Sequence, residues 1–204
     1  MNKPLSFVHR FEPGDDPTRP PILLLHGTGG DEHDLIPFGE FVAPGSPLLS
    51  PRGKVLERGM PRFFRRLSEG VLDEDDVRFR AGELADFVAE AREAYRLPAP
   101  IAVGFSNGAN IAAAMLMLRP QSLAGAVLLR AMAPLRQAPE ADLTGKSVLL
   151  ISGKNDSIIP AESVTRLASA LTHAGAALRH ETLPAGHQLS EADSTLVRDW
   201  IATR

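Results

Sequence analysis

The chain contains one stretch from which its fold can be predicted, Ile101-Ala-Val-Gly-Phe-Ser106-Asn-Gly-Ala-Asn-Ile-Ala-Ala-Ala-Met115. An apolar run enters this stretch, a Gly-x-Ser-x-Gly pentapeptide stands at its centre, and a run of small residues leaves it. The pattern predicts a sharp strand-to-helix turn that holds a serine at the top of a sheet. Glycine at positions 104 and 108 removes the side chains that would collide in so tight a turn. Ser106 is therefore a candidate nucleophile.

Strands and helices alternate on both sides of this turn. Loose alternation predicts an edge strand at 5–11, and apolar runs predict inner strands at 21–25, 47–50, 100–105, 123–129 and 147–151. Residues 178–183 show a weaker strand pattern. Helical spacing and helix-terminal residues predict helices at 34–42, 78–96, 107–119, 160–175 and 189–201. The order predicts an α/β protein, with one domain over residues 1–204 and a mostly parallel sheet of about seven strands covered by helices on both faces.

The amino-acid composition argues against several classes of partner and of site. The net charge of −3 favours neither nucleic acid nor an anionic membrane surface as a partner, and the apolar runs are far shorter than a membrane span. The absence of cysteine excludes disulfides, cysteine-based zinc sites and a cysteine nucleophile. The N-terminal residues lack the pattern of a secretory signal, so a cytoplasmic location is the default expectation.

Chemically distinctive residues follow four of the predicted strands. They are the segment His26-Gly-Thr-Gly-Gly, Ser106, Asp156 and His187. Because ligands bind at the carboxyl ends of strands in an open parallel sheet, we expect all four to lie at one edge. A serine hydroxyl needs a base, for which we predict His187, and the base needs an orienting acid, for which we predict Asp156. The chain order of serine, aspartate and histidine is that of the α/β-hydrolase fold.

An acyl-transfer site also needs hydrogen-bond donors for the oxyanion of its tetrahedral intermediate. The backbone N–H that follows the nucleophile belongs to Asn107, and the glycine-rich loop after the first inner strand offers the N–H of Thr28. We expect His26 to support this loop structurally. The chemistry requires neither a metal nor an organic cofactor, and His33 with its neighbouring aspartates matches no zinc pattern.

These residues together resemble the phospholipase/carboxylesterase family of α/β-hydrolases, which also contains the acyl-protein thioesterases. The similarity runs from His26-Gly through Pro51-Arg-Gly, Gly104-Phe-Ser-Asn-Gly108 and Asp156 to Gly186-His187. It implies serine esterase activity with Ser106, Asp156 and His187 as the triad. Thioesterases of the family usually have His-Gly-Leu-Gly-Asp at the first motif and glutamine after the serine. The differences at both places favour a small carboxylesterase.

The segment 51–77 has the least regular pattern, and a long connection of this kind is often functional. Residues 131–146 are too few for a helical lid, so we expect an open site without a cap domain. We expect Phe63, Phe64 and Met132 to line a modest pocket for short to medium esters. Packing of Phe63 and Phe64 in the core is an equally good interpretation.

Several alternatives remain open at this level. An acyl-protein thioesterase or a lysophospholipase would use the same three side chains, and a non-catalytic binding protein could be built on the same fold. A homodimer is an expectation from the family resemblance alone.

Overall fold

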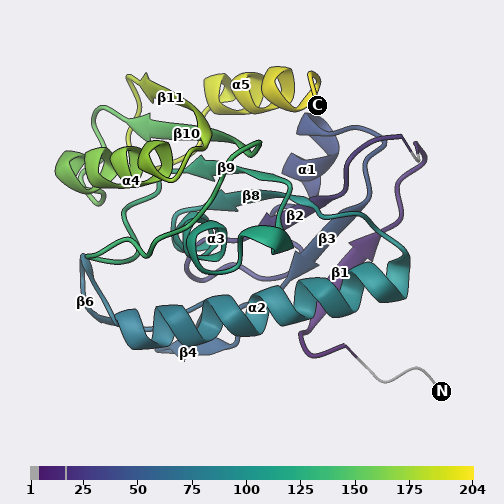
Figure 1. The fold of residues 1–204 in the computed structure, drawn as a ribbon, viewed down its shortest axis with the longest axis horizontal. Coiled ribbons are helices and arrows are strands. Elements are labelled where there is room, and N and C mark those ends of the chain that lie inside the picture. The colour runs from purple at the N-terminus through teal and green to yellow at the C-terminus, as the bar shows by residue number, and fades with distance from the viewer. Residues whose placement is uncertain (1–4, 17) are drawn as a thin grey trace.

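The structure, a computed structural model, describes residues 5–16 and 18–204 and is built around a seven-stranded sheet (Figure 1). The strands lie in the order β1-β3-β2-β8-β9-β10-β11, and only the pairing of β1 with β3 is antiparallel. Their bounds are β1 His9–Glu12, β2 Ile22–Leu25, β3 Leu48–Pro51, β8 Ile101–Phe105, β9 Gly125–Leu129, β10 Ser147–Gly153 and β11 Ala177–Leu183. The predicted mostly parallel sheet of seven strands is confirmed, with β1 at its edge.

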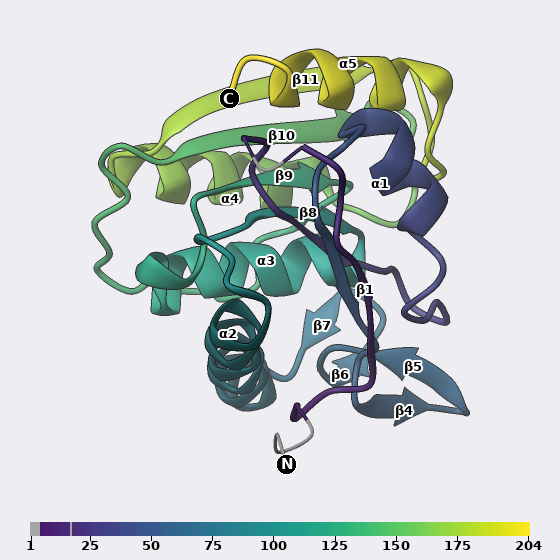
Figure 2. The ribbon, with the colours of Figure 1, turned by 90° about the vertical axis from the view of Figure 1, so that its right-hand side faces the viewer.

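Helices cover both faces of the sheet (Figure 2). The α-helices are α1 Ile36–Val42, α2 Glu74–Tyr95, α3 Asn107–Leu118, α4 Ala161–His173 and α5 Glu191–Ile201, and a short 3-10 helix spans Pro120–Ser122. Buried residues of α2, α3 and α4 form one core cluster against the sheet, and those of α1 and α5 form a second cluster on the other face.

Strand β2 shows how the two core layers arise. Leu23 and Leu25 belong to the cluster beneath α2, α3 and α4, whereas Ile22 and Leu24 belong to the cluster beneath α1 and α5. Successive side chains of a strand point to opposite faces, so a strand covered on both sides is apolar throughout. This explains why continuous apolar runs mark the inner strands of this sheet.

The segment 51–77 is more regular than its sequence suggests. It contains two small antiparallel hairpins, one of β4 Val55–Glu57 and β5 Met60–Arg62, the other of β6 Arg66–Ser68 and β7 Val71–Leu72. The turn of the first hairpin places Arg58 and Gly59 at φ angles of 52° and 83°. Strands of two or three residues carry too little periodicity for sequence patterns to reveal them.

Among the residues that the structure describes, no cap domain interrupts the fold. The residues between β9 and β10, where a lid could be inserted, contain no helix or strand. Within residues 5–16 and 18–204, we find no helix with the length and apolar character that crossing a membrane requires.

Candidate active site

Ser106 lies in a strained turn between β8 and α3. Its φ angle of 52° is one that non-glycine residues rarely adopt. The turn is also crowded, because a Cβ atom at Gly108 would lie 2.0 Å from the carbonyl oxygen of Leu25. A Cβ at Gly104 would lie 2.5 Å from the carbonyl oxygen of Gly108. Both glycines are thus required by close backbone approach, as the sequence pattern predicts.

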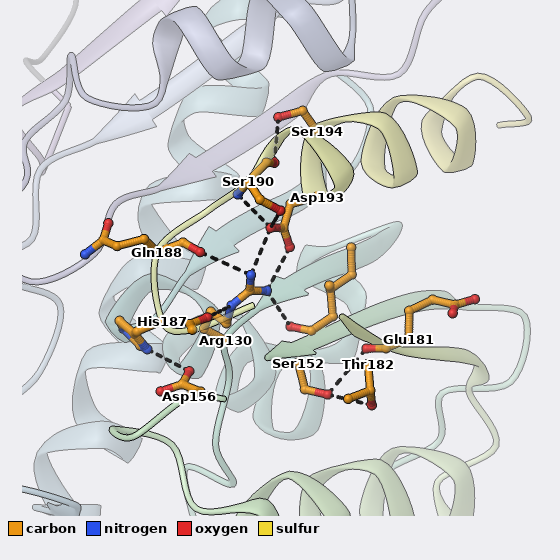
Figure 3. A network of polar contacts seen from close by, with 12 residues as sticks. Arg130, Ser152, Asp156, Glu181, Thr182, His187, Gln188, Ser190, Asp193 and Ser194 are labelled. Carbon is orange, nitrogen blue, oxygen red and sulfur yellow. Dashed lines mark hydrogen bonds and ion pairs between the residues drawn. The ribbon is translucent and has the colours of Figure 1, made fainter. Parts of the chain in front are cut away.

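Three side chains from three strand ends meet at this turn. His187 follows β11, and its Nε2 atom lies 2.9 Å from Oγ of Ser106. Asp156 follows β10, and its Oδ2 atom lies 2.8 Å from Nδ1 of His187, the contact drawn in Figure 3. Thirty-one residues separate Asp156 from His187, and 81 separate Ser106 from His187. The parallel sheet therefore assembles the arrangement that a serine nucleophile needs.

Asp156 is held in one orientation by its own loop. The Oδ1 atom accepts hydrogen bonds from the backbone N–H groups of Ile158 at 2.8 Å and Ile159 at 3.1 Å. Burial, the largest single influence, raises the pKa of Asp156, but the hydrogen bonds from His187 and from these two N–H groups outweigh it and lower the pKa overall. The group is therefore an anionic acceptor for His187 at neutral pH.

His26 supports the glycine-rich loop after β2. Its Nε2 atom accepts a hydrogen bond from the backbone N–H of Gly53 at 3.0 Å, so the proton resides on Nδ1, which donates to the carbonyl of Gly27 at 2.6 Å. Burial lowers the pKa of His26, which favours this neutral form. His26 is thus a structural link between the loop and the segment after β3.

The β4–β5 hairpin contacts both residues predicted to hold an oxyanion. The guanidinium of Arg62 donates from Nη1 to Oγ1 of Thr28 at 3.0 Å. The backbone N–H of Phe63 donates to Oδ1 of Asn107 at 2.8 Å. The hairpin is further joined to the loop by the bond from Gly29 N–H to the Pro61 carbonyl at 2.9 Å. Thr28 and Asn107 are therefore fixed relative to each other through one hairpin.

A cavity of about 50 Å³ adjoins Ser106. Its lining includes Thr28, Arg62, Arg66, Asn107, Asn110, Met132 and Ile159. Met132 lies where the sequence suggested, but Phe63 and Phe64 do not line this cavity. Their side chains are 3% and 0% exposed and belong to the core cluster beneath α2, α3 and α4. The expected aromatic lining is therefore corrected to a polar wall from the same segment.

The polar wall consists of two arginines that share one carboxylate. Arg66 donates twice to Oε1 of Glu57, at 2.8 and 3.0 Å, and Nη1 of Arg62 lies 3.1 Å from Oε2 of Glu57. Hydrogen bonds from Arg66, the largest influence, lower the pKa of Glu57. Burial lowers the pKa of Arg62, and Glu57 opposes that shift. Ser106 and these two arginines thus line one cavity, whose remaining lining includes the apolar side chains of Leu72, Met132, Ile158 and Ile159.

A larger cavity of about 270 Å³ lies beside Asp156 but does not reach the nucleophile. Residues of β10, β11 and α4 line it, among them Ser152, Val164 and His180. Neither Ser106 nor Thr28 is part of this lining. Of these two cavities, the smaller one is therefore the one that Ser106 lines.

Two residues near the site were not singled out by sequence reasoning. Arg62 is 4% exposed and Arg130 is 1% exposed, although both carry a charge. Each lies next to a buried apolar segment in the sequence, and this position could have identified them as candidates for burial. Arginine is almost never fully buried without a partner, so a buried arginine indicates a specific polar contact. Neither residue belongs to a recognised motif.

Comparison with known proteins agrees with the geometry. The family described as Phospholipase/Carboxylesterase matches residues 8–204, so the chain belongs to this family of hydrolases. It is 45% identical over 181 residues to the Bacillus subtilis (strain 168) protein named "Putative hydrolase MhqD", covering 88% of this chain and 90% of that protein.

Two solved carboxylesterase structures are similar over nearly the whole chain. The carboxylesterase of Bacillus cereus shares 43% identity with a TM-score of 0.94, covering 97% of this chain and 94% of that one. The carboxylesterase of Mesorhizobium loti shares 30% identity with a TM-score of 0.92, covering 98% and 96%. The fold is therefore that of carboxylesterases in this family.

Proposed function

We propose that this protein is a serine carboxylesterase that hydrolyses small to medium esters through an acyl-serine intermediate. The observation that carries the proposal is the chain of two hydrogen bonds from Ser106 through His187 to Asp156, 2.9 and 2.8 Å long, at a strained turn. The family and the two carboxylesterases of similar structure support an ester as the substrate.

Acylation follows from the hydrogen bonds around His187. Asp156 keeps the imidazole proton on Nδ1, so Nε2 accepts the hydroxyl proton of Ser106 while Oγ attacks the ester carbonyl carbon. The N–H groups of Thr28 and Asn107 stabilise the resulting oxyanion. The bond to the alcohol oxygen then breaks, and His187 donates its new proton to that oxygen.

Deacylation uses the same groups in reverse. His187 removes a proton from a water molecule, whose oxygen attacks the acyl carbon, and the tetrahedral intermediate again occupies the oxyanion donors. The bond to Oγ breaks, the carboxylic acid leaves, and Ser106 recovers its proton from His187.

The cavity beside Ser106 supports a preference for short acyl groups. Its volume of about 50 Å³ leaves no enclosed channel for a long aliphatic chain, and arginine side chains form part of its wall. A long chain would extend beyond this small cavity and be only partly buried, so each added methylene would contribute less than the roughly 0.8 kcal/mol of full burial.

A panel of acetyl, butyryl, octanoyl and palmitoyl esters of one chromogenic alcohol tests this proposal. We expect kcat/KM to be highest for the two short esters and to fall with length. A preference for the palmitoyl ester would contradict the proposed substrate class and favour the lysophospholipase or thioesterase alternatives. Matched butyryl ester and butyryl thioester substrates then separate esterase from thioesterase activity.

Labelling with a fluorophosphonate tests the nucleophile. We expect mass spectrometry to find the label on Ser106 alone, and the Ser106→Ala variant to remain folded, unlabelled and without ester hydrolysis. A non-catalytic binding protein on this fold would show neither labelling nor turnover.

A further inference from the structure

The geometry points to Arg130 as a positioning residue for His187, because its guanidinium anchors both sides of the loop that carries the histidine. This inference rests on the proposed role of His187 as the base. Arg130 follows β9, at the same carboxyl edge of the sheet as Ser106, and is 1% exposed. It belongs to none of the motifs described above.

The backbone of Arg130 directs its side chain into the site. Its φ angle of 55° lies in the left-handed region, which non-glycine residues rarely occupy. The backbone N–H donates to the carbonyl of Ile151 on β10 at 2.9 Å, which fixes this conformation against the neighbouring strand. The side chain then extends past the end of β10 toward the loop after β11 (Figure 3).

The guanidinium binds the backbone immediately before and after His187. Its Nε atom donates to the carbonyl of Gly186 at 2.8 Å, and Nη2 donates to the carbonyl of Gln188 at 3.2 Å. Figure 3 shows the guanidinium of Arg130 between Gln188 and Asp193. Because one rigid planar group binds the residues on both sides of His187, Arg130 holds the backbone of His187 and thereby positions its imidazole.

Asp193 fixes the guanidinium in turn. Nη1 donates to Oδ1 at 2.7 Å and Nη2 donates to Oδ2 at 2.8 Å, and both side chains are fully buried. Ser190 donates to Oδ2 of Asp193 from its backbone N–H and from its hydroxyl, which caps α5. The loop carrying His187 and the first turn of α5 therefore share one buried ion pair.

The planar shape of arginine is essential to this arrangement. Lysine would preserve the charge beside Asp193, but its single ammonium group cannot reach both carbonyls and both carboxylate oxygens in one plane. His187 must satisfy two directional hydrogen bonds at once, with Ser106 and with Asp156. A shift of about 1 Å in such a site reduces the rate by roughly 10²-fold.

The Arg130→Lys variant tests the inference. With the butyryl ester we expect kcat to fall about 10- to 100-fold while KM changes little, because the loop carries the base and not the substrate pocket. We also expect loss or broadening of the downfield proton resonance of the hydrogen bond between His187 and Asp156. The control is Ile201→Ala, which removes core packing at the far end of α5 and touches none of the partners of Arg130; its kcat and its resonance stay unchanged.

A second variant tests the same inference if Arg130→Lys does not fold. Arg130→Met combined with Asp193→Leu removes both buried charges, and such replacement often preserves folding. The same loss of kcat and of the resonance is expected there. A folded variant of either kind with unchanged kcat and an unchanged resonance would overturn the role of Arg130. If the wild-type protein hydrolyses no ester, the proposed function fails, and the resonance still reports whether Arg130 positions His187.

Discussion

The side-chain oxygen of Asn107 accepts a hydrogen bond from the backbone N–H of Phe63, 44 residues earlier in the chain, at 2.8 Å. This contact joins the first residue of α3 to the residue that directly follows the β4–β5 hairpin. Because the backbone N–H of Asn107 is a proposed oxyanion donor, one residue serves the site twice. Its backbone N–H is the proposed donor to the oxyanion, and its side chain binds the segment that forms the polar wall.

Replacing Asn107 with alanine removes this acceptor and leaves the buried N–H of Phe63 without it. We expect the free energy of unfolding, measured in urea, to fall by about 1–3 kcal/mol. We also expect kcat for a short ester to fall, because the hairpin that fixes Thr28 loses its link to the turn. The matched control is Ser163→Ala on α4, which removes the hydroxyl that accepts a hydrogen bond from the backbone N–H of Ala133. A similar loss of stability with unchanged kcat is expected there.

Replacing Asp156 with asparagine is expected to reduce kcat by about 10⁴-fold with little effect on KM. The N–H groups of Ile158 and Ile159 require an acceptor at the Oδ1 position, so the asparagine carbonyl must lie there and its NH₂ must face His187. That NH₂ can only donate, which moves the imidazole proton to Nε2 and removes the base. Steady-state kinetics of the purified variant test this. A loss of less than tenfold would contradict the role of Asp156.

Two glycine-to-alanine substitutions should have opposite effects. In Gly108→Ala the new Cβ would lie 2.0 Å from the Leu25 carbonyl oxygen, so the turn must distort. We expect lower thermal stability and strongly reduced esterase activity. In Gly82→Ala the nearest atom to the new Cβ is a flexible arginine nitrogen at 3.6 Å, and the position is inside α2. The free energy of unfolding of that variant should rise by about 0.5–1 kcal/mol, and its esterase activity should stay unchanged.

The buried pair of Arg130 and Asp193 predicts a specific response to acid. Burial, the largest influence, raises the pKa of Asp193, but hydrogen bonds from Arg130 and Ser190 outweigh it and lower the pKa below its ordinary 3.8. A lowered carboxyl pKa contributes stability above pH 3.8 that is lost as the pH falls through the folded-state value. Near neutral pH, we expect the free energy of unfolding of the wild-type protein to exceed that of Asp193→Asn by about 3–5 kcal/mol.

Urea unfolding at decreasing pH measures this difference. The difference in the free energy of unfolding between wild type and Asp193→Asn should become smaller below pH 3.8. The Ile201→Ala variant, which removes only apolar packing, should differ from wild type by the same amount at every pH. A constant difference for Asp193→Asn would show that the carboxylate charge does not stabilise the fold.

Local patterns were sufficient to predict the parallel sheet and the positions of Ser106, Asp156 and His187. Ser106 and Asp156 follow continuous apolar runs, His187 follows a weaker strand pattern, and the carboxyl ends of parallel strands share one edge. The pattern around Phe63 and Phe64 was not sufficient. Two adjacent aromatic residues are compatible with a pocket or with the core, and only the pairing of the hairpin against α3 decides between them.

The amino-acid sequence alone therefore establishes the sheet, the sharp turn at Ser106 and the order of the candidate triad, because these depend on short-range periodicity and on glycine at two crowded positions. The polar wall at Arg62 and the anchoring of His187 by Arg130 required the tertiary structure. Their partners are distant in the chain, since Arg130 and Asp193 are 63 residues apart and Arg62 and Thr28 are 34 apart. Such contacts form only when packing brings the segments together, and no local pattern encodes which charge will meet which.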